Sequence, residues 1–219
     1  MNILDTFELK REQAKLARKI ILRDDFNRIK TIGGIDCAVV GDNILAYVVV
    51  CEFPSMEIVE KKKYLLTNPL PYRPGFQAYR EMPAMIEAFN SLEQEPDLIL
   101  VSGTGVAHPR KLGIASHLGL ALNKPTIGVT QKLVFGNVDK GKIMLYNDIV
   151  GFEIITREHA NPVYVSPGHL VSLGSTLDTV SKIIKFPHKM PEPLHLAHKF
   201  ARKKVKKIIA EVSDEPSES

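Results

Sequence analysis

The sequence predicts an α/β fold in which a mixed sheet is flanked by helices. Residues 31–53 contain two apolar runs of strand length on either side of a Gly-Asp-Asn turn, which is typical of an antiparallel hairpin. Further along, the short apolar runs 97–101 and 125–129 alternate with helical patterns, as in parallel strand–helix units. With 219 residues, of which 44% are hydrophobic, the chain is long enough for one substantial domain, expected over residues 1–212.

The first half of the chain is expected to place antiparallel strands between two helices. Apolar residues recur at helical spacing near the N-terminus and again after a proline-rich loop. Between these patterns, runs rich in β-branched residues are separated by turn residues. The expected helices are residues 7–21 and 77–92, and the expected strands are residues 31–40, 44–53 and 57–65.

The second half is expected to alternate strands with helices. Pro109 suits the first turn of a helix, so a helix is expected to begin there. Residues 213–219 are acidic and rich in serine and proline, and this tail is expected to be disordered. The expected strands are residues 97–101, 125–129 and 163–166, and the expected helices are residues 109–122, 172–185 and 194–212.

Charge and cysteine content narrow the class of protein. A net charge of +4 is compatible with a polyanionic partner, and the basic residues gather at 61–63 and 199–207, although each cluster could be a solvated surface. Cys37 and Cys51 lack the spacing of a zinc site, so reduced thiols in a cytoplasmic chain are expected. Since no apolar run is long enough to span a bilayer, we expect no membrane contact. We also expect a monomer.

Asp36 is the first candidate site residue. It lies in the middle of an apolar strand, where a carboxylate is costly unless it is paired or holds a metal ion. A hydrogen-bonded structural aspartate is the alternative. Gly33 and Gly34 would let another group approach this strand closely, which favours a site.

The second candidate segment is a proline-rich loop that contains Tyr72. Pro71 and Pro74 stiffen the loop and hold the ring rigidly, as stacking against a nucleic-acid base requires. Ordinary packing of the tyrosine is the alternative. Glu81 is expected at the start of the following helix, where the helix dipole favours a carboxylate.

The third candidate segment is a glycine-rich turn, Gly103-Thr104-Gly105, between a buried strand and His108. Backbone N–H groups in such a turn can receive a phosphate or the edge of a base. The turn matches neither the Walker pattern nor the dinucleotide fingerprint. His108 could instead simply cap the turn.

Taken together, these segments resemble the endonuclease V family, whose fold is ribonuclease H-like. The resemblance covers roughly residues 31–202, and its blocks appear in family order. They are Gly-Ile-Asp at 34–36, Pro-Tyr-Arg-Pro-Gly at 71–75, Tyr-Arg-Glu at 79–81, Gly-Val-Ala-His-Pro-Arg-Lys-Leu-Gly at 105–113, Pro-Thr-Ile-Gly-Val at 125–129, Pro-Val-Tyr-Val-Ser-Pro-Gly-His at 162–169 and Leu-Ala-His at 196–198.

The resemblance implies a nuclease in DNA repair that uses Mg²⁺, with Mn²⁺ as an alternative ion. It implies recognition of inosine in DNA, or in RNA, and cleavage one nucleotide further to the 3′ side. Mg²⁺ prefers carboxylate and phosphate oxygens and stabilises charge at phosphorus. The implied site consists of metal-binding, catalytic Asp36 and Glu81, a wedge of Tyr72 and Pro74, a base pocket of Gly75, Gly103 and Gly105, and catalytic His108 near the scissile phosphate.

Two positions depart from the family pattern. The family strand before the glycine turn ends with a metal-binding aspartate, and here Ser102 takes that metal position with a neutral hydroxyl. Asp97 cannot substitute, because five residues of strand at about 3.3 Å each place it about 16 Å away on the opposite face. The lysine that the family places after Gly-Val-Ala is displaced: Gln131 stands there, and Lys132, the remaining catalytic candidate, follows.

Three hypotheses therefore stay open. The first is an active, slower metal-dependent endonuclease. The second is a protein of the same fold that binds inosine-containing nucleic acid without cutting it. The third is a mononucleotide-binding enzyme built on the glycine turn. Both departures affect the expected catalytic half of the site, whereas the base-recognition half matches the family.

Overall fold

The computed structural model describes residues 5–157 and 159–213. The strands are β1 (Thr31–Val40), β2 (Asn43–Glu52), β3 (Ile58–Leu66), β4 (Leu98–Ser102), β5 (Thr126–Thr130), β6 (Asn137–Asp139), β7 (Lys142–Leu145), β8 (Asp148–Ile154) and β9 (Val163–His169). The helices are α1 (Thr6–Ala17), α2 (Gln77–Asn90), α3 (Ile114–Leu122), α4 (Leu173–Lys182) and α5 (Glu192–Ser213).

All of these strands form one mixed sheet, as predicted. Its strand order is β3-β2-β1-β4-β5-β9-β8-β7-β6. Strands β1, β4 and β5 are parallel, and every other neighbouring pair is antiparallel. Because β4 and β5 run in the same direction, the loops that follow them emerge at the same edge of the sheet. That edge carries the candidate site.

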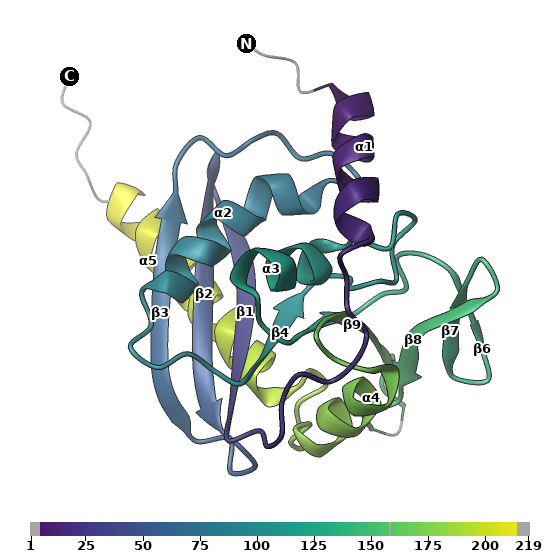
Figure 1. Ribbon diagram of the computed structural model, residues 1–219. Helices are drawn as coiled ribbons and strands as arrows, with labels where there is room; N and C mark the ends of the chain where they lie inside the picture. Colours follow the sequence, from purple (N-terminus) through teal and green to yellow (C-terminus); the bar gives the residue numbers. More distant parts are fainter. Residues whose placement is uncertain (1–4, 158, 214–219) are drawn as a thin grey trace.

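Helices cover both faces of the sheet (Figure 1). One core packs α4 and α5 against the sheet through residues such as Val180, Leu194 and Ala197. The other core packs α2 and α3 against the opposite face through residues such as Met85 and Leu118. Alternation along the central strands gives each face its own buried side chains, so successive residues of β1 face different helices.

Gly34, two residues before Asp36, lets a helix approach the strand closely. A Cβ atom on Gly34 would lie 2.2 Å from the carbonyl carbon of Pro193, in the first turn of α5. Any side chain there would push α5 off the sheet. The close approach expected at this strand is therefore made by α5, and it places the early residues of the helix beside Asp36.

One predicted helix start and one predicted residue position are wrong. The helix expected from Pro109 begins at Ile114, because Lys111 has φ +51 and the chain loops back so that Gly113 N donates to Gly105 O at 2.9 Å. Glu81 does not begin a helix either, because α2 starts at Gln77 and places Glu81 in its second turn.

Other differences are smaller. The first helix ends at Ala17, earlier than predicted, and the predicted sheet lacked the three strands β6 to β8. These strands are short, and only Ile143, Val150 and Gly151 in them are buried, so they lack the burial pattern of a core strand. The expected disordered tail lies outside the described residues, except for Ser213, which ends α5. Within residues 5–157 and 159–213, no helix is both long and apolar enough to cross a membrane.

Candidate functional site

Two cavities lie side by side at the edge of the sheet where β4 and β5 end. Ser102 lines one cavity and Gly103, the next residue, lines the other. Likewise, Thr130 lines one and Gln131 lines the other. Since successive Cα atoms are about 3.8 Å apart, the two cavities share a wall only one residue thick.

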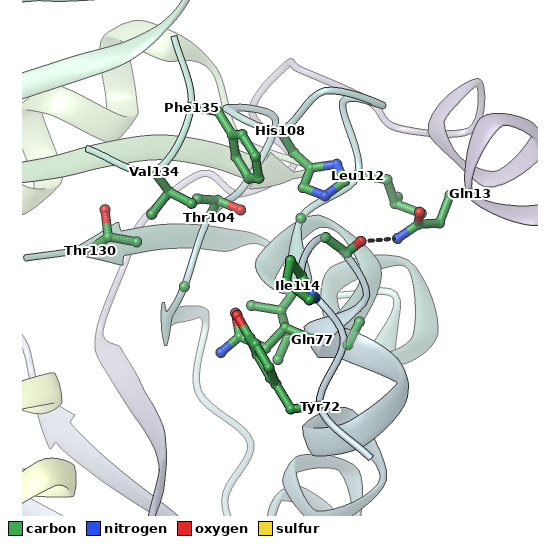
Figure 2. A pocket seen from close by; sticks show the side chains of 15 residues that line it. Gln13, Tyr72, Gln77, Thr104, His108, Leu112, Ile114, Thr130, Val134 and Phe135 are labelled. Carbon is green, nitrogen blue, oxygen red and sulfur yellow. Dashed lines mark hydrogen bonds between the residues drawn. The ribbon is translucent and has the colours of Figure 1, made fainter. Parts of the chain in front are cut away.

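The first cavity has a volume of about 240 Å³ and is walled largely by apolar groups. Tyr72 and Gln77 lie on one side of it, and His108 and Phe135 lie on the other (Figure 2). Tyr72 is 63% exposed, so its ring is available for stacking rather than used in the core. This size is below that of most drug-binding sites and suits a small planar group such as a base.

The loop that carries Tyr72 is held in place through the carbonyl of Gly75. Gln13 Nε2 and Arg110 Nη2 donate to that carbonyl oxygen at 3.1 and 2.8 Å. Gly75 itself has φ +77, a conformation that other residues rarely adopt. Arg110 also lies over the ring of Phe76, with its Cζ 4.8 Å from the centroid. The loop is thus clamped between α1 and the turn after His108.

The two glycines of the 103–105 turn have different tasks. Gly103 lines the cavity with φ +147, and a Cβ atom there would lie 2.2 Å from Ile114 Cγ2. Gly105 lies behind the wall, because its Cβ would be 2.1 Å from Pro167 O. Their N–H groups donate to Val129 O and Ser166 Oγ, at 3.0 and 2.8 Å. These donors are used within the sheet, which removes the main reason to expect a mononucleotide phosphate at this turn.

His108 is buried in the first cavity. Burial and, second, the charge of Arg110 lower the pKa of His108 to about 4, so its ring is neutral at neutral pH. Its Nδ1 accepts a hydrogen bond from Arg110 N at 3.3 Å, and its ring meets Phe135 edge-on with centroids 5.2 Å apart. The structure therefore places His108 as a neutral wall of the first cavity and gives it the turn-capping contact considered above.

The second cavity has a volume of about 210 Å³ and contains Asp36. Both carboxylate oxygens of this buried side chain are oriented: Oδ1 accepts from Cys37 N at 2.9 Å, and Oδ2 accepts from His198 Nδ1 at 2.7 Å. Ser102, Gln131 and Lys189 line the same cavity.

Glu81 approaches Asp36 from the α2 side and does not line the second cavity. Its Oε2 accepts from Gln77 Nε2 at 2.9 Å. Burial is the largest cause that raises the pKa of Glu81, the hydrogen bond from Gln77 opposes it, and the charge of Asp36 adds to it, so that the pKa is about 7. Both carboxylates also contribute, after burial, to the raised pKa of Cys37. The two acids are therefore within electrostatic range of each other.

The donor set fits a hard divalent cation that is held loosely. A cation would reduce the repulsion between the two carboxylates. Mg²⁺ commonly binds one or two protein carboxylates together with water and substrate phosphate. Ser102 adds only a hydroxyl. No preassembled group of three or more His, Cys, Asp or Glu side chains able to hold a metal ion occurs in the described part of the chain. Substrate phosphate would therefore have to complete the coordination.

Several site residues were not singled out from the sequence. His198 was noted only within a matching block, while Lys189 and Gln13 carried no signal because their partners lie far away in the chain. Lys132, by contrast, is exposed on the loop after β5 and does not line the second cavity. Asp97 is far from the site: its Oδ2 accepts from the backbone N–H groups of Lys30 and Thr31 at 2.7 and 2.9 Å.

Comparison with known proteins shows the family and the fold. The family model described as Endonuclease V matches residues 14–199. An endonuclease V from Dictyoglomus thermophilum is 37% identical over 204 residues, which is 90% of this chain and 89% of the relative. The Bacillus subtilis endonuclease V structure superposes with a TM-score of 0.87 at 26% identity, covering 96% of each chain. A Ciona intestinalis endonuclease V, solved with DNA containing an inosine followed by a ribo-adenosine, gives 0.86 at 27% identity, covering 95% of this chain and 100% of that one.

The sheet order and the cavity of Asp36 at its edge, together with these likenesses, define a nuclease of the ribonuclease H-like class. The chain belongs to the endonuclease V family. Members of this family are metal-dependent nucleases.

Proposed function

We propose that this protein recognises inosine in DNA, or in RNA, and hydrolyses a phosphodiester bond one nucleotide to the 3′ side in the repair of deaminated bases. The observation that carries the proposal is the wall shared by the two cavities, at Ser102–Gly103 and Thr130–Gln131. A base held in the first cavity keeps a nearby phosphate of its strand at the second. The Ciona relative solved with inosine-containing DNA supports inosine as the base.

The first cavity would receive a base that has left the duplex stack. Unstacking costs free energy, and the exposed ring of Tyr72, on the loop stiffened by Pro74, would fill the gap that the base leaves. Gly75 and Gly103 keep the backbone close enough to contact the base edge. His108 and Phe135 form the opposite wall.

Asp36 and Glu81 would hold the catalytic ion, Mg²⁺ or Mn²⁺, with the Ser102 hydroxyl as a weaker neighbour. When bound, a divalent ion activates water and neutralises charge that develops at phosphorus. His198 fixes the orientation of Asp36 through the bond to Oδ2. Ligand orientation of this kind strengthens metal binding.

A cation beside the scissile phosphate is also needed. Lys189 is half-buried in the wall of the second cavity and forms no ion pair with any described residue. Lys132 would have to move to reach the same place. We therefore assign the phosphate contact to Lys189 and keep Lys132 as the alternative.

A second function is favoured by one observation. Ser102 lines the cavity of Asp36 with a neutral hydroxyl in place of a metal-binding aspartate, and Gln131 lines it with a neutral amide in place of a lysine, so both the ion and the scissile phosphate would be held by fewer charges. In that case the protein would bind inosine-containing nucleic acid without cutting it.

The two functions are separated by scoring binding and cleavage independently. Purified protein is incubated with an inosine-containing duplex and single strand, and with matched inosine-free strands, in Mg²⁺ or Mn²⁺. Cleavage only of inosine-containing strands supports the nuclease, and its loss in Asp36→Asn assigns the reaction to the second cavity. Selective binding without product at high protein concentration leaves only the binding function, and equal binding of both strands contradicts both.

A further inference from the structure

The two basic clusters of the sequence meet on one face of the molecule. Figure 1 shows α5 running behind β1–β3, on the side of the sheet away from α2. Lys61 of β3 places Nζ 4.4 Å from the ring centroid of Phe200 on α5, and that ring stacks with Tyr47 of β2 at 5.7 Å. Lys63, two residues on, points to the same side of the strand. Lys62 points the other way and pairs with Glu60 and Glu93.

The cations of α5 lie along its outer side. Leu194, Ala197 and Ala201 are buried against the sheet. The exposed basic residues follow at steps of three or four, which is one side of a helix. They are Lys199, Arg202, Lys203, Lys206 and Lys207, all exposed.

Little negative charge compensates this surface. Glu211 lies 4.0 Å from Lys204 and 3.7 Å from Lys207. Lys199, Arg202, Lys203 and Lys206 form no ion pair with any described residue. Like charges four residues apart destabilise a helix, and Lys199 with Lys203, and Arg202 with Lys206, are such pairs. A polyanion on this surface would remove that repulsion.

The basic surface begins at the candidate site. His195 and His198, on the first turns of α5, line the cavity of Asp36, and Lys199 is the next residue. From Lys199 to Lys207 the helix rises about 12 Å at about 1.5 Å per residue. That length corresponds to three or four phosphate steps at about 3.4 Å per step along one strand of a duplex.

We propose that the outer side of α5, with Lys61 and Lys63 of β3, binds the phosphate backbone of nucleic acid as it leaves the cavity of Asp36. A membrane surface is the less suitable partner, because a helix that binds a bilayer needs a free apolar face. The apolar face of α5 is covered by the sheet. The inference rests on the proposed function for the identity of the polymer, although it does not depend on inosine recognition or on cleavage.

The test compares two triple variants on an inosine-free duplex, so that base recognition plays no part. One carries Lys199→Gln, Arg202→Gln and Lys206→Gln. The matched control carries Lys30→Gln, Lys140→Gln and Lys142→Gln, three exposed lysines away from α5 and β3 that form no ion pair with described residues. Dissociation constants are measured over a range of salt concentrations, and melting temperatures confirm folding.

The surface variant should flatten the slope of log affinity against log salt by about 2–3, since each lost phosphate contact removes about 0.9. The control should keep the slope of the unmodified protein, and so should Lys199→Arg with Lys206→Arg. The affinity for an inosine-containing duplex divided by the affinity for an inosine-free duplex should be the same in the surface variant as in the unmodified protein. An unchanged slope in the folded surface variant overturns the proposal. So does loss of binding to phosphatidylserine vesicles with an unchanged DNA slope, which would assign the surface to membranes.

If the unmodified protein binds both duplexes equally but the salt slope is still flatter in the surface variant, the proposed function fails and this inference stands.

Discussion

His198 Nδ1 lies 2.7 Å from Oδ2 of Asp36, and this bond joins the start of α5 to the middle of β1. The other oxygen of Asp36 is fixed by the N–H group of Cys37. Gly34 makes the arrangement possible, because any side chain there would displace the first turn of α5. The carboxylate is thus oriented from two sides before substrate arrives, as a metal ligand should be.

His198→Ala is therefore expected to weaken metal use. Loss of the orienting bond should reduce metal affinity or cleavage about 10-fold to 100-fold. The measurement is cleavage of an inosine-containing duplex across a Mg²⁺ titration, together with Mn²⁺ binding by electron paramagnetic resonance. His195→Ala is the control, because His195 lines the same cavity without bonding to Asp36. Equal losses of metal affinity and cleavage in both variants would show that the hydrogen bond to Asp36 is not the cause of the loss.

Ser102→Asp should strengthen metal binding and increase cleavage. It adds a carboxylate to the cavity that contains Asp36, and Mg²⁺ prefers such ligands. Isothermal titration with Mn²⁺ and single-turnover cleavage report the two effects separately. Ser102→Asn introduces a side chain with the shape of aspartate but without its charge, and it should neither strengthen metal binding nor increase cleavage. If Ser102→Asp folds and binds DNA but leaves both quantities unchanged, position 102 is not a metal position.

Lys189→Met should lower cleavage more than Lys132→Met. Of these two lysines, Lys189 lines the cavity of Asp36, whereas Lys132 is exposed on the loop after β5. Removal of a cation that stabilises the transition state should lower kcat with little change in KM. Lys189→Arg should keep most of the activity. A larger loss with Lys132→Met would return the phosphate contact to that residue.

The pKa of His108 should be measurable by nuclear magnetic resonance as about 4. The ordinary value is about 6.5, so the unfolded chain binds a proton before the folded chain as pH falls. Above about pH 6.5 the group contributes no pH dependence to stability, and between about 6.5 and 4 it lowers the free energy of unfolding progressively. Arg110→Gln should raise the pKa of His108, because the charge of the guanidinium is, after burial, the second cause that lowers this pKa. A ring that titrates near 6.5 in the folded protein would contradict the buried, neutral wall.

Much of the fold was predictable because its strong patterns are local. The hairpin of β1 and β2 pairs ten residues of each strand around the expected turn. Strands β4 and β5 follow from short apolar runs between helices. Strands β6 to β8 were not predicted, because few of their residues are buried. These strands are held by pairing with one another, which apolar periodicity in a sequence does not reveal.

The site was less predictable than the fold. Asp36 stood out because a carboxylate in an apolar strand needs a reason. The division of the site into two cavities could not be predicted, since it depends on which side of β4 and β5 each adjacent residue faces. Nor could the bond from His198, 162 positions away from Asp36 in the chain, or the clamp on Gly75 by Gln13 and Arg110. Only the folded chain brings these residues together.

The most direct test maps the cut on an end-labelled duplex that contains a single inosine. The proposed function predicts one labelled product, broken at the phosphodiester bond one nucleotide to the 3′ side of inosine, and no product with Asp36→Asn. Cleavage at another position, or equal cleavage of an inosine-free duplex, would contradict the coupling of a base cavity to the cavity of Asp36.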